Sequence, residues 1–293
     1  MSDTSAQPEP LEPLGPLAAE LEALGQTPVQ GDVPSIAPPG PPPIGPVIVF
    51  DNVSISFNGR AVLHNVSFSV ERGETLCILG RSGVGKSVSL RLLMGFLAPD
   101  SGSIQVEGKE ITDLDEEGMR AIRKRVTMVF QNGALFDSLS VRENVAFPLR
   151  EHGGLAEDQI EQIVDRLIAL VGAEDVTDAL PASLSTGRKR AVAMARALAA
   201  QPEIVLYDEP TTMVDPIIAR RLGNLIQRLK RQLGFTSIVV THDTRFAQML
   251  ADKVLFLDQG RAEYFGPLSG FMDSQDADIR QFLTLDTYQV PVE

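Results

Sequence analysis

One segment of the chain has the residue types and the spacing of a phosphate-binding loop, Gly-Arg-Ser-Gly-Val-Gly-Lys-Ser at residues 80–87. The glycines allow the backbone to bend and to bring N–H groups to phosphate oxygens, and the start of the next helix adds its positive end. Lys86 would reach the β- and γ-phosphates of a nucleotide, and the Ser87 hydroxyl would bind Mg²⁺. We therefore expect the nucleotide to contact Gly80, Arg81, Ser82, Gly83, Val84, Gly85, Lys86, Ser87 and Val88.

A second polar pair follows the apolar run at residues 204–207. A strand that is buried on both faces carries no charge until its end, and there Asp208 can hold Mg²⁺ directly or through water. Glu209 beside it is the candidate to polarise an attacking water molecule. The alternative is an ordinary strand that ends in an acidic turn.

Two further positions add to this set. His242 ends the strand predicted at residues 237–240, where it would contact a γ-phosphate unless it is merely structural. Ser185, Thr186 and Gly187 open a helix whose amino end is another possible anion site, which would call for a second nucleotide or a second subunit. Taken alone, Ser185 is an ordinary N-cap, and residues 188–190 form a solvated basic helix face.

The elements that must position these residues alternate in the manner of an α/β sheet. Polar residues at the carboxyl ends of such strands mark the ligand-binding edge. Asn58-Gly59 is a hairpin signal, and Ser140 with Glu143 forms a capping box that starts a helix running toward Leu149. We predict strands at 47–57, 75–79, 104–106, 126–130, 204–208, 237–240 and 254–257, and helices at 88–96, 115–125, 156–171, 185–200 and 217–233.

Composition restricts the class of protein. In a chain of 293 residues, a net charge of −13 argues against a protein that coats nucleic acid or lipid, although a local basic patch could still bind either. Its only cysteine, Cys77, lies in an apolar strand and is predicted to be a small buried residue in a reducing compartment. The first residues lack the charged and apolar regions of a signal peptide, so we expect none, and no apolar run approaches the roughly 20 residues of a membrane span. We therefore expect a cytoplasmic protein that acts at a membrane only through a partner.

The first 46 residues differ from the rest, since they hold 12 of the 20 prolines and six acidic residues but no lysine or arginine. Such a composition cannot bury enough apolar surface to offset its ordering entropy, which predicts a disordered acidic tail. The proline-rich run at residues 38–46 is alternatively a polyproline ligand.

Taken together, these motifs resemble the nucleotide-binding subunit of ABC transporters over residues 47–266. In chain order they are Walker A (residues 80–87), the Q-loop Gln131, the signature (residues 184–188), Walker B with the catalytic glutamate (Asp208 and Glu209), the D-loop (Val214 and Asp215) and the switch histidine His242. The resemblance implies a P-loop NTPase with a RecA-like mixed sheet, an N-terminal antiparallel β subdomain and a helical subdomain at about 132–200.

The same resemblance assigns roles within an ATPase that uses ATP and Mg²⁺. Phe57 matches the position that stacks on adenine, although on sequence alone it is as readily a core residue. Gln131 would join Ser87 and Asp208 at the metal and Glu209 and His242 in catalysis. Two copies would bind head to tail and enclose two ATP molecules, each between Walker A of one copy and Ser185, Thr186, Gly187 and Asp215 of the other.

A narrower resemblance, at residues 130–152, 236–243 and 279–283, is to the ATPase of Mla-type transporters, which move phospholipids across a diderm envelope. It implies a permease dimer, an MCE-type lipid-binding partner and a place on the inner face of the inner membrane. We further predict that an apolar stripe in residues 267–293 contributes to contacts between the two copies.

Two departures and two rival functions accompany this reading. Thr186 and Arg188 replace the glycine and the glutamine or methionine usual in the signature, and Met213-Val214 replaces Gly-Leu or Ala-Leu in the D-loop. The rivals are a soluble ABC ATPase serving nucleic acid or the ribosome, and an assembly scaffold. Leu135, Phe136, Phe147 and Pro148 discriminate, because they offer an apolar surface where a permease would dock.

Overall fold

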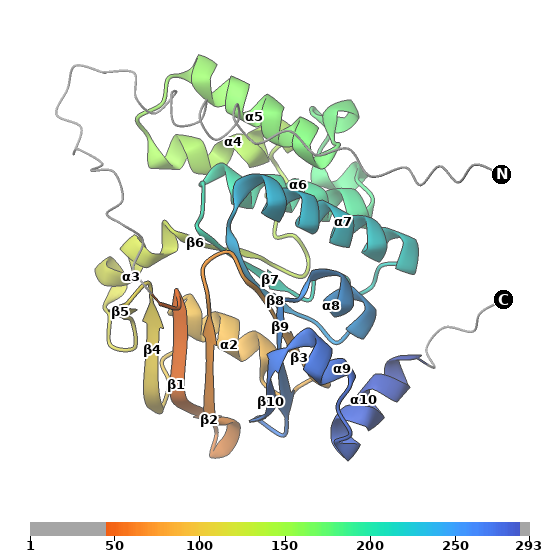
Figure 1. Ribbon diagram of the computed structural model, residues 1–293. Coiled ribbons are helices and arrows are strands. Elements are labelled where there is room, and N and C mark those ends of the chain that lie inside the picture. The colour runs from red at the N-terminus through yellow and green to blue at the C-terminus, as the bar shows by residue number, and fades with distance from the viewer. Residues whose placement is uncertain (1–44, 288–293) are drawn as a thin grey trace, which may run out of the picture. The chain divides into compact units, whose positions relative to one another are not determined.

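A six-stranded mixed sheet forms the centre of the computed structural model, which describes residues 45–287 (Figure 1). The strand order is β10-β9-β3-β8-β7-β6, and β10 is the antiparallel member. β3, β7 and β8 are buried on both faces and consist mainly of apolar residues, which is the pattern that predicts parallel strands. The bounds are β3 Thr75–Leu79, β6 Val126–Val129, β7 Ile204–Asp208, β8 Thr236–Val240, β9 Lys253–Asp258 and β10 Arg261–Pro267.

A second, antiparallel sheet has the order β2-β1-β4-β5. The predicted hairpin is confirmed: Asn58 and Gly59 have φ of 52° and 75°, and this left-handed pair joins β1 to β2. Inside the sheet, Phe50 and Phe68 stack with ring centroids 4.4 Å apart. The bounds are β1 Ile48–Phe57, β2 Arg60–Val70, β4 Ser101–Val106 and β5 Lys109–Glu110.

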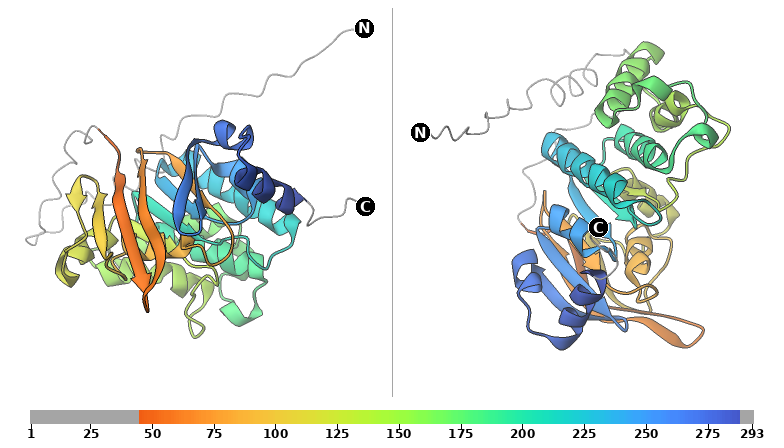
Figure 2. Two further views of the ribbon diagram at one scale, coloured as in Figure 1. Left: turned by 90° about the horizontal axis from the view of Figure 1, so that it is seen from below. Right: turned by 90° about the vertical axis from the view of Figure 1, so that its right-hand side faces the viewer.

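The helices divide between the sheets and a separate group. α4, α5 and α6 pack on one another, and α7 lies between this group and the strands (Figures 1 and 2). The predicted capping box of Ser140 and Glu143 starts α4. The bounds are α2 Lys86–Leu93, α3 Glu116–Arg123, α4 Val141–His152, α5 Glu157–Val171, α6 Thr186–Ala199, α7 Pro216–Leu233 and α8 Thr244–Leu250. No helix within residues 45–287 combines the length and the apolar character needed to cross a lipid bilayer.

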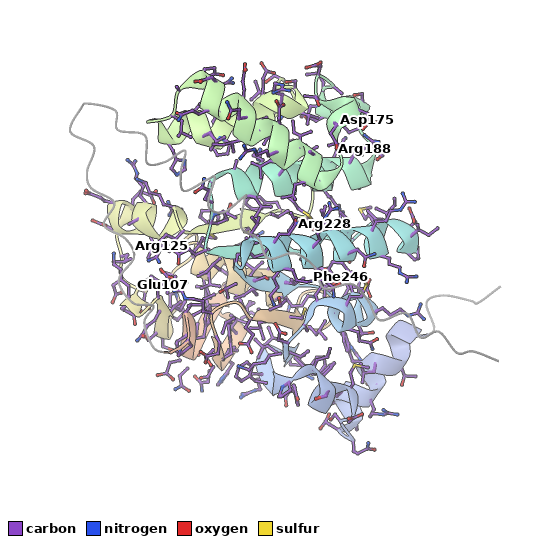
Figure 3. All side chains as sticks on the ribbon, turned by 45° about the horizontal axis from the view of Figure 1, so that its top comes forward. Glu107, Arg125, Asp175, Arg188, Arg228 and Phe246 are labelled. Atoms are coloured by element: carbon purple, nitrogen blue, oxygen red, sulfur yellow. The ribbon has the colours of Figure 1, made fainter. Side chains whose placement is uncertain are left out.

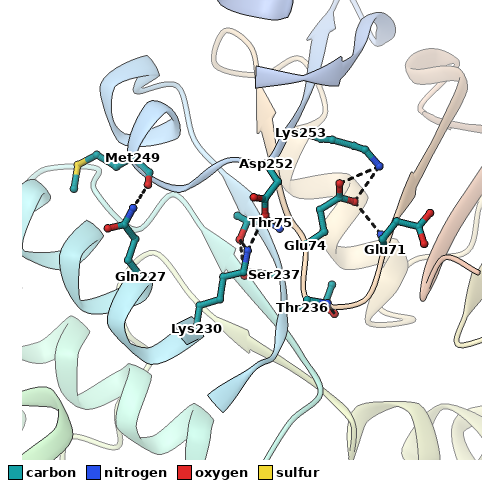
Figure 4. A network of polar contacts seen from close by, with 11 residues as sticks. Glu71, Glu74, Thr75, Gln227, Lys230, Thr236, Ser237, Met249, Asp252 and Lys253 are labelled. Atoms are coloured by element: carbon teal, nitrogen blue, oxygen red, sulfur yellow. Dashed lines mark hydrogen bonds and ion pairs between the residues drawn. The ribbon is translucent and has the colours of Figure 1, made fainter. Parts of the chain in front are cut away.

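A polar network fixes α7 to the amino ends of the central strands (Figure 4). Lys230 Nζ lies 2.7 Å from Thr75 Oγ1 and 2.7 Å from Asp252 Oδ2, and the same carboxylate oxygen accepts the backbone N–H of Thr75 at 2.7 Å. Cys77 lies on β3, the same strand as Thr75. It is buried as predicted, and burial raises the pKa of its thiol.

The sequence predicts one feature for each end of the chain, and the structure bears only on the prediction for the C-terminal end. The predicted tail lies outside the described residues, apart from its last two. At the other end, α9 (Leu268–Met272) and α10 (Ala277–Thr287) carry Phe271, Ile279 and Phe282, which are buried within this chain. The rings of Phe271 and Phe282 lie 5.6 and 5.0 Å from that of Phe256 on β9. The apolar stripe that suggested contacts between copies is therefore already covered, which corrects the basis of that prediction.

We expect Phe271→Ala to destabilise the protein by about 3–5 kcal/mol, because the fully buried ring leaves a cavity next to Phe256 and Tyr264. Urea titration followed by far-UV circular dichroism measures this change. The exposed Phe265→Ala serves as the control and should cost much less. Equal losses in the two variants would contradict the packing of α9 on β9.

Candidate nucleotide-binding site

The phosphate-binding loop connects β3 to α2 and requires glycine at two positions at least. Gly80 has φ of 151°, and a Cβ there would lie 2.3 Å from the carbonyl oxygen of Leu257. Gly85 has φ of 105°, and its Cβ would lie 2.6 Å from Leu63 Cδ2. Side chains would therefore force the loop away from β9 and β2, and the loop would lose its shape.

Lys86, the first residue of α2, is only 5% exposed. Its Nζ donates to the carbonyl oxygens of Gly80 at 2.9 Å and Arg81 at 3.1 Å, and it lies 3.3 Å from Glu209 Oε1. The loop thus curls around its own lysine. This arrangement holds a cation at the amino end of a helix, where phosphate oxygens bind best.

Asp208 ends β7 opposite the loop. The Ser87 hydroxyl donates to its Oδ1 at 2.6 Å, so the two predicted metal ligands are in direct contact. Burial raises the pKa of Asp208, and the bond from Ser87 opposes that rise. The described residues contain no group of three or more His, Cys, Asp or Glu side chains suited to a metal. A hydroxyl, a carboxylate and the Gln131 amide nevertheless fit Mg²⁺, which commonly takes its other ligands from phosphates and water.

Besides the contact with Lys86, two further contacts orient the carboxylate of Glu209. His242 Nδ1 lies 2.8 Å from its Oε2, and Thr212 Oγ1 donates to the same oxygen at 3.0 Å. Burial raises the pKa of Glu209, but the bond from His242 and the charge of Lys86 outweigh it, and the net pKa lies below the usual value. The pKa of His242 is raised, chiefly by its bond to Glu209. Glu209 is therefore a carboxylate held in place at neutral pH, as a general base must be.

These groups surround one cavity of about 660 Å³. Ten of the predicted residues line it: Arg81, Ser82, Gly83, Gly85, Lys86, Ser87, Val88, Gln131, Glu209 and His242. Gly80 and Val84 of the loop are not among the lining residues. Asp208 at the end of β7 is not among them either, although it accepts a hydrogen bond from Ser87, which lines the cavity. Phe57, predicted to stack on adenine, is half exposed at the end of β1 and does not line the cavity, whereas Val62 on β2 does.

The signature residues lie elsewhere in the same chain. Ser185 caps α6 and accepts the N–H of Arg188 at 3.4 Å, and Thr186 is the exposed first residue of the helix. Ser185 and Gly187 line a separate cavity of about 470 Å³ beside α7. Asp215 caps α7 by accepting the N–H groups of Ile217 and Ile218 at 2.9 and 3.0 Å. Within one chain, these residues and the phosphate-binding loop therefore do not share a cavity.

The basic run after the signature does not form the uniform solvated face that the sequence predicted. Arg188 follows the prediction, since its Nη1 reaches Asp175 Oδ1 at 2.5 Å on the surface (Figure 3). Arg190 contradicts it, because its side chain is 4% exposed and turned into the protein toward the loop after β7. The helix rotates by about 100° per residue, so position 190 faces inward although its neighbours do not.

Sequence analysis missed three residues of the site, namely Val62, Thr212 and Phe282. Thr212 had a usable signal, because a hydroxyl three residues after Glu209 in a turn is well placed to return to its carboxylate. Val62 and Phe282 are ordinary apolar residues in the sequence, and only the packing of β2 and α10 brings them to the cavity.

The comparisons with known proteins agree with this geometry. The ABC transporter family model matches residues 63–212. The methionine import ATP-binding protein MetN of Brucella abortus is 38% identical over 247 residues, which cover 84% of this chain and 67% of that protein. The phospholipid transport ATP-binding protein MlaF of Haemophilus influenzae is 37% identical over 237 residues, which cover 81% of this chain and 90% of that protein. The chain thus spans about two thirds of the length of MetN.

Solved structures give the same picture. The dimeric ATP-binding cassette MJ0796, solved in a post-hydrolysis state with ADP and Pi, superposes with a TM-score of 0.70 at 29% identity, covering 75% of this chain and 98% of that one. CbiO1 of Clostridium perfringens, part of the transporter complex cbiONQ, superposes with a TM-score of 0.73 at 29% identity, covering 83% of this chain and 96% of that one.

Proposed function

Because the chain belongs to the ABC transporter family and is an ABC ATPase, we propose that it powers a membrane permease by closing as a dimer around ATP. One observation carries the proposal: Lys86, Glu209 and His242 meet in one cavity, with Ser87 and Asp208 in contact beside them. That set can bind a triphosphate, hold Mg²⁺ at Ser87, Asp208 and Gln131, and activate water.

Dimerisation follows from the separation of the two halves of the site. The signature residues Ser185, Thr186 and Gly187 line no part of the loop cavity in their own chain. A second copy placed head to tail would bring the positive amino end of its α6 to the γ-phosphate. The dimer of MJ0796 with ADP and Pi supports such an arrangement for this fold.

The permease would dock on the aromatic pair that follows Gln131. Phe136 and Phe147 contact each other with ring centroids 4.7 Å apart, and they are 42% and 37% exposed. Asn144, buried beneath them, accepts the N–H of Phe136 at 2.9 Å and donates to the carbonyl oxygens of Phe136, Leu139 and Ser140. The pair is thus presented on a firmly held segment, which favours a partner protein over a chance exposure.

The cargo that we propose is phospholipid, moved between the membranes of a diderm envelope, with an MCE-type partner and a place on the inner face of the inner membrane. The support is that the likeness to Mla-type ATPases lies at residues 130–152, the segment that carries the permease-docking pair. The similarity to MetN makes methionine the alternative cargo.

Purification of the chain from detergent-solubilised membranes tests this function. We expect a multi-span permease to accompany the wild type and phospholipid to stimulate ATP hydrolysis by the complex in proteoliposomes. The double variant Phe136→Ser, Phe147→Ser should lose the permease and keep ATP binding. If methionine with its binding protein stimulates ATP hydrolysis instead, methionine is the cargo and the phospholipid assignment is wrong. Association with ribosomes or nucleic acid alone would overturn the whole proposal.

Thr186 gives a sharper test of the dimer. Threonine restricts the backbone and adds a side chain where glycine would allow close approach to the partner's ATP. Its hydroxyl could bind a phosphate oxygen, but the start of α6 already supplies backbone donors there. We expect Thr186→Gly to raise the hydrolysis rate and to tighten the ATP-bound dimer in a Glu209→Gln background, measured by sedimentation. Slower hydrolysis with a weaker dimer would show that the hydroxyl is a ligand.

A further inference from the structure

Arg190 is a buried cation whose hydrogen bonding is incomplete. Its Nη2 donates to the carbonyl oxygen of Thr212, 22 residues further along the chain. Within the part of the chain that the structure describes, Nε and Nη1 are buried without an acceptor. Burial also lowers the pKa of the guanidinium. A group in this state calls for an explanation other than ordinary packing.

Thr212, whose carbonyl oxygen Arg190 contacts, also donates a hydrogen bond to the carboxylate of Glu209. Thr212 Oγ1 donates to Glu209 Oε2 at 3.0 Å, and the same oxygen lies 2.8 Å from His242 Nδ1. The backbone around this turn is strained, because Glu209 and Met213 have left-handed φ of 47° and 61°. A strained turn keeps its shape only when surrounding contacts impose it, and the bond from Arg190 is one such contact.

Stability alone does not account for this arginine. Replacing a buried charge by an apolar side chain of similar size is often neutral or stabilising, because the desolvation cost of the charge disappears. A methionine would fill much of the same space on α6 and leave no buried donor unpaired. The guanidinium therefore has a role that methionine cannot fill, and the interaction that methionine would lack is the hydrogen bond to the Thr212 carbonyl oxygen.

We propose that Arg190 is a positioning residue: by holding the backbone of Thr212 it sets the Thr212 hydroxyl against Glu209, and so ties the signature helix to the hydrolytic site of the same chain. The inference rests on the proposed role of Glu209 as the general base. Arg190 acts through Thr212 and touches neither substrate nor metal. Its two unpaired nitrogens, Nε and Nη1, belong to a buried side chain of α6, the helix whose amino end carries the signature.

Steady-state kinetics of single variants of the full chain test this role. We expect Arg190→Met to lower kcat about tenfold, as the loss of a bond that orients a charged group would, with KM changed by less than about twofold. The melting temperature should change little, because removal of the buried charge offsets the loss of the hydrogen bond to the Thr212 carbonyl. Arg190→Lys should recover part of kcat, since lysine keeps a donor. Thr212→Val should match the loss in Arg190→Met, and Thr212→Ser should restore the rate.

A double-mutant cycle separates this route from a general disturbance. If Arg190 acts through the Thr212 hydroxyl, Arg190→Met should have little further effect on kcat in the Thr212→Val background. The matched control is Arg228→Met, which removes another guanidinium-to-carbonyl bond, from α7 to Leu170 at the end of α5 (Figure 3). It should leave kcat unchanged.

Three results would overturn the proposal: an unchanged kcat in Arg190→Met, a kcat that falls only together with the melting temperature, or additive effects of the two substitutions. Glu209→Gln measured in parallel separates the two levels. If it loses hydrolysis while Arg190→Met does not, the positioning role alone fails. If it hydrolyses ATP at the wild-type rate, the proposed role of Glu209 fails with it.

Discussion

Replacing Glu209 by glutamine is expected to slow ATP hydrolysis at least ~10²-fold while ATP binding remains. The amide has almost the size of the carboxylate, so the contacts with Thr212 and Lys86 can largely persist. An amide, however, cannot accept a proton from water. In the proposed mechanism the dimer closes around ATP and opens after hydrolysis, so the variant should accumulate as an ATP-bound dimer.

Phosphate release and analytical ultracentrifugation measure the two effects on the same protein sample. The control is Glu116→Gln, which removes a carboxylate that is paired with Arg123 on the surface of α3, far from the cavity residues, and it should behave as the wild type. Hydrolysis by Glu209→Gln at the wild-type rate would remove this residue from the mechanism. Slow hydrolysis without a dimer would leave the base in place and contradict the closure of two copies around ATP.

Lys86→Ala is expected to weaken ATP binding by at least about 100-fold, since charge-assisted bonds to the β- and γ-phosphates are lost. The loss has a second cause. Without the ammonium group 3.3 Å away, Glu209 keeps only His242 and Thr212 as partners, and its negative charge, next to that of Asp208, repels phosphate more strongly. Calorimetric titration with ATP and Mg²⁺ measures the affinity, and Lys109→Ala on exposed β5 is the control. An affinity within a few-fold of the wild type would show that this cavity is not the triphosphate site.

Sequence alone predicted the bounds of the central strands to within one or two residues where few structures are compatible with the local residue pattern. The runs at 76–79 and 204–207 hold no charged residue and are fully buried, which fits a strand covered on both faces and little else of that length. Asn58-Gly59 tolerates left-handed backbone at both positions, so the hairpin was equally restricted. The phosphate-binding loop lies between a strand and a helix as predicted, because the spacing of its glycines restricts the backbone of residues 80–87. The contacts of these residues with a nucleotide stay a prediction.

What sequence missed depends on contacts between residues far apart in the chain. Arg190 is buried because the loop after β7 covers α6, and no local pattern shows that contact. Phe282 lines the nucleotide cavity because α10 returns to β9. The same return buries the C-terminal stripe that the sequence assigned to a second copy. Apolar periodicity predicts that a face is covered and gives no information about which surface covers it.

The most direct test of the account mixes two inactive variants. Lys86→Ala keeps an intact signature but cannot hold ATP in its own loop, and Ser185→Arg keeps its loop but blocks the amino end of α6. If the site is built from two copies, mixed dimers contain one complete site, and hydrolysis in the mixture must exceed the sum of the separate variants. A mixture that hydrolyses ATP no faster than that sum would contradict the composite site and, with it, the ATP-driven dimer.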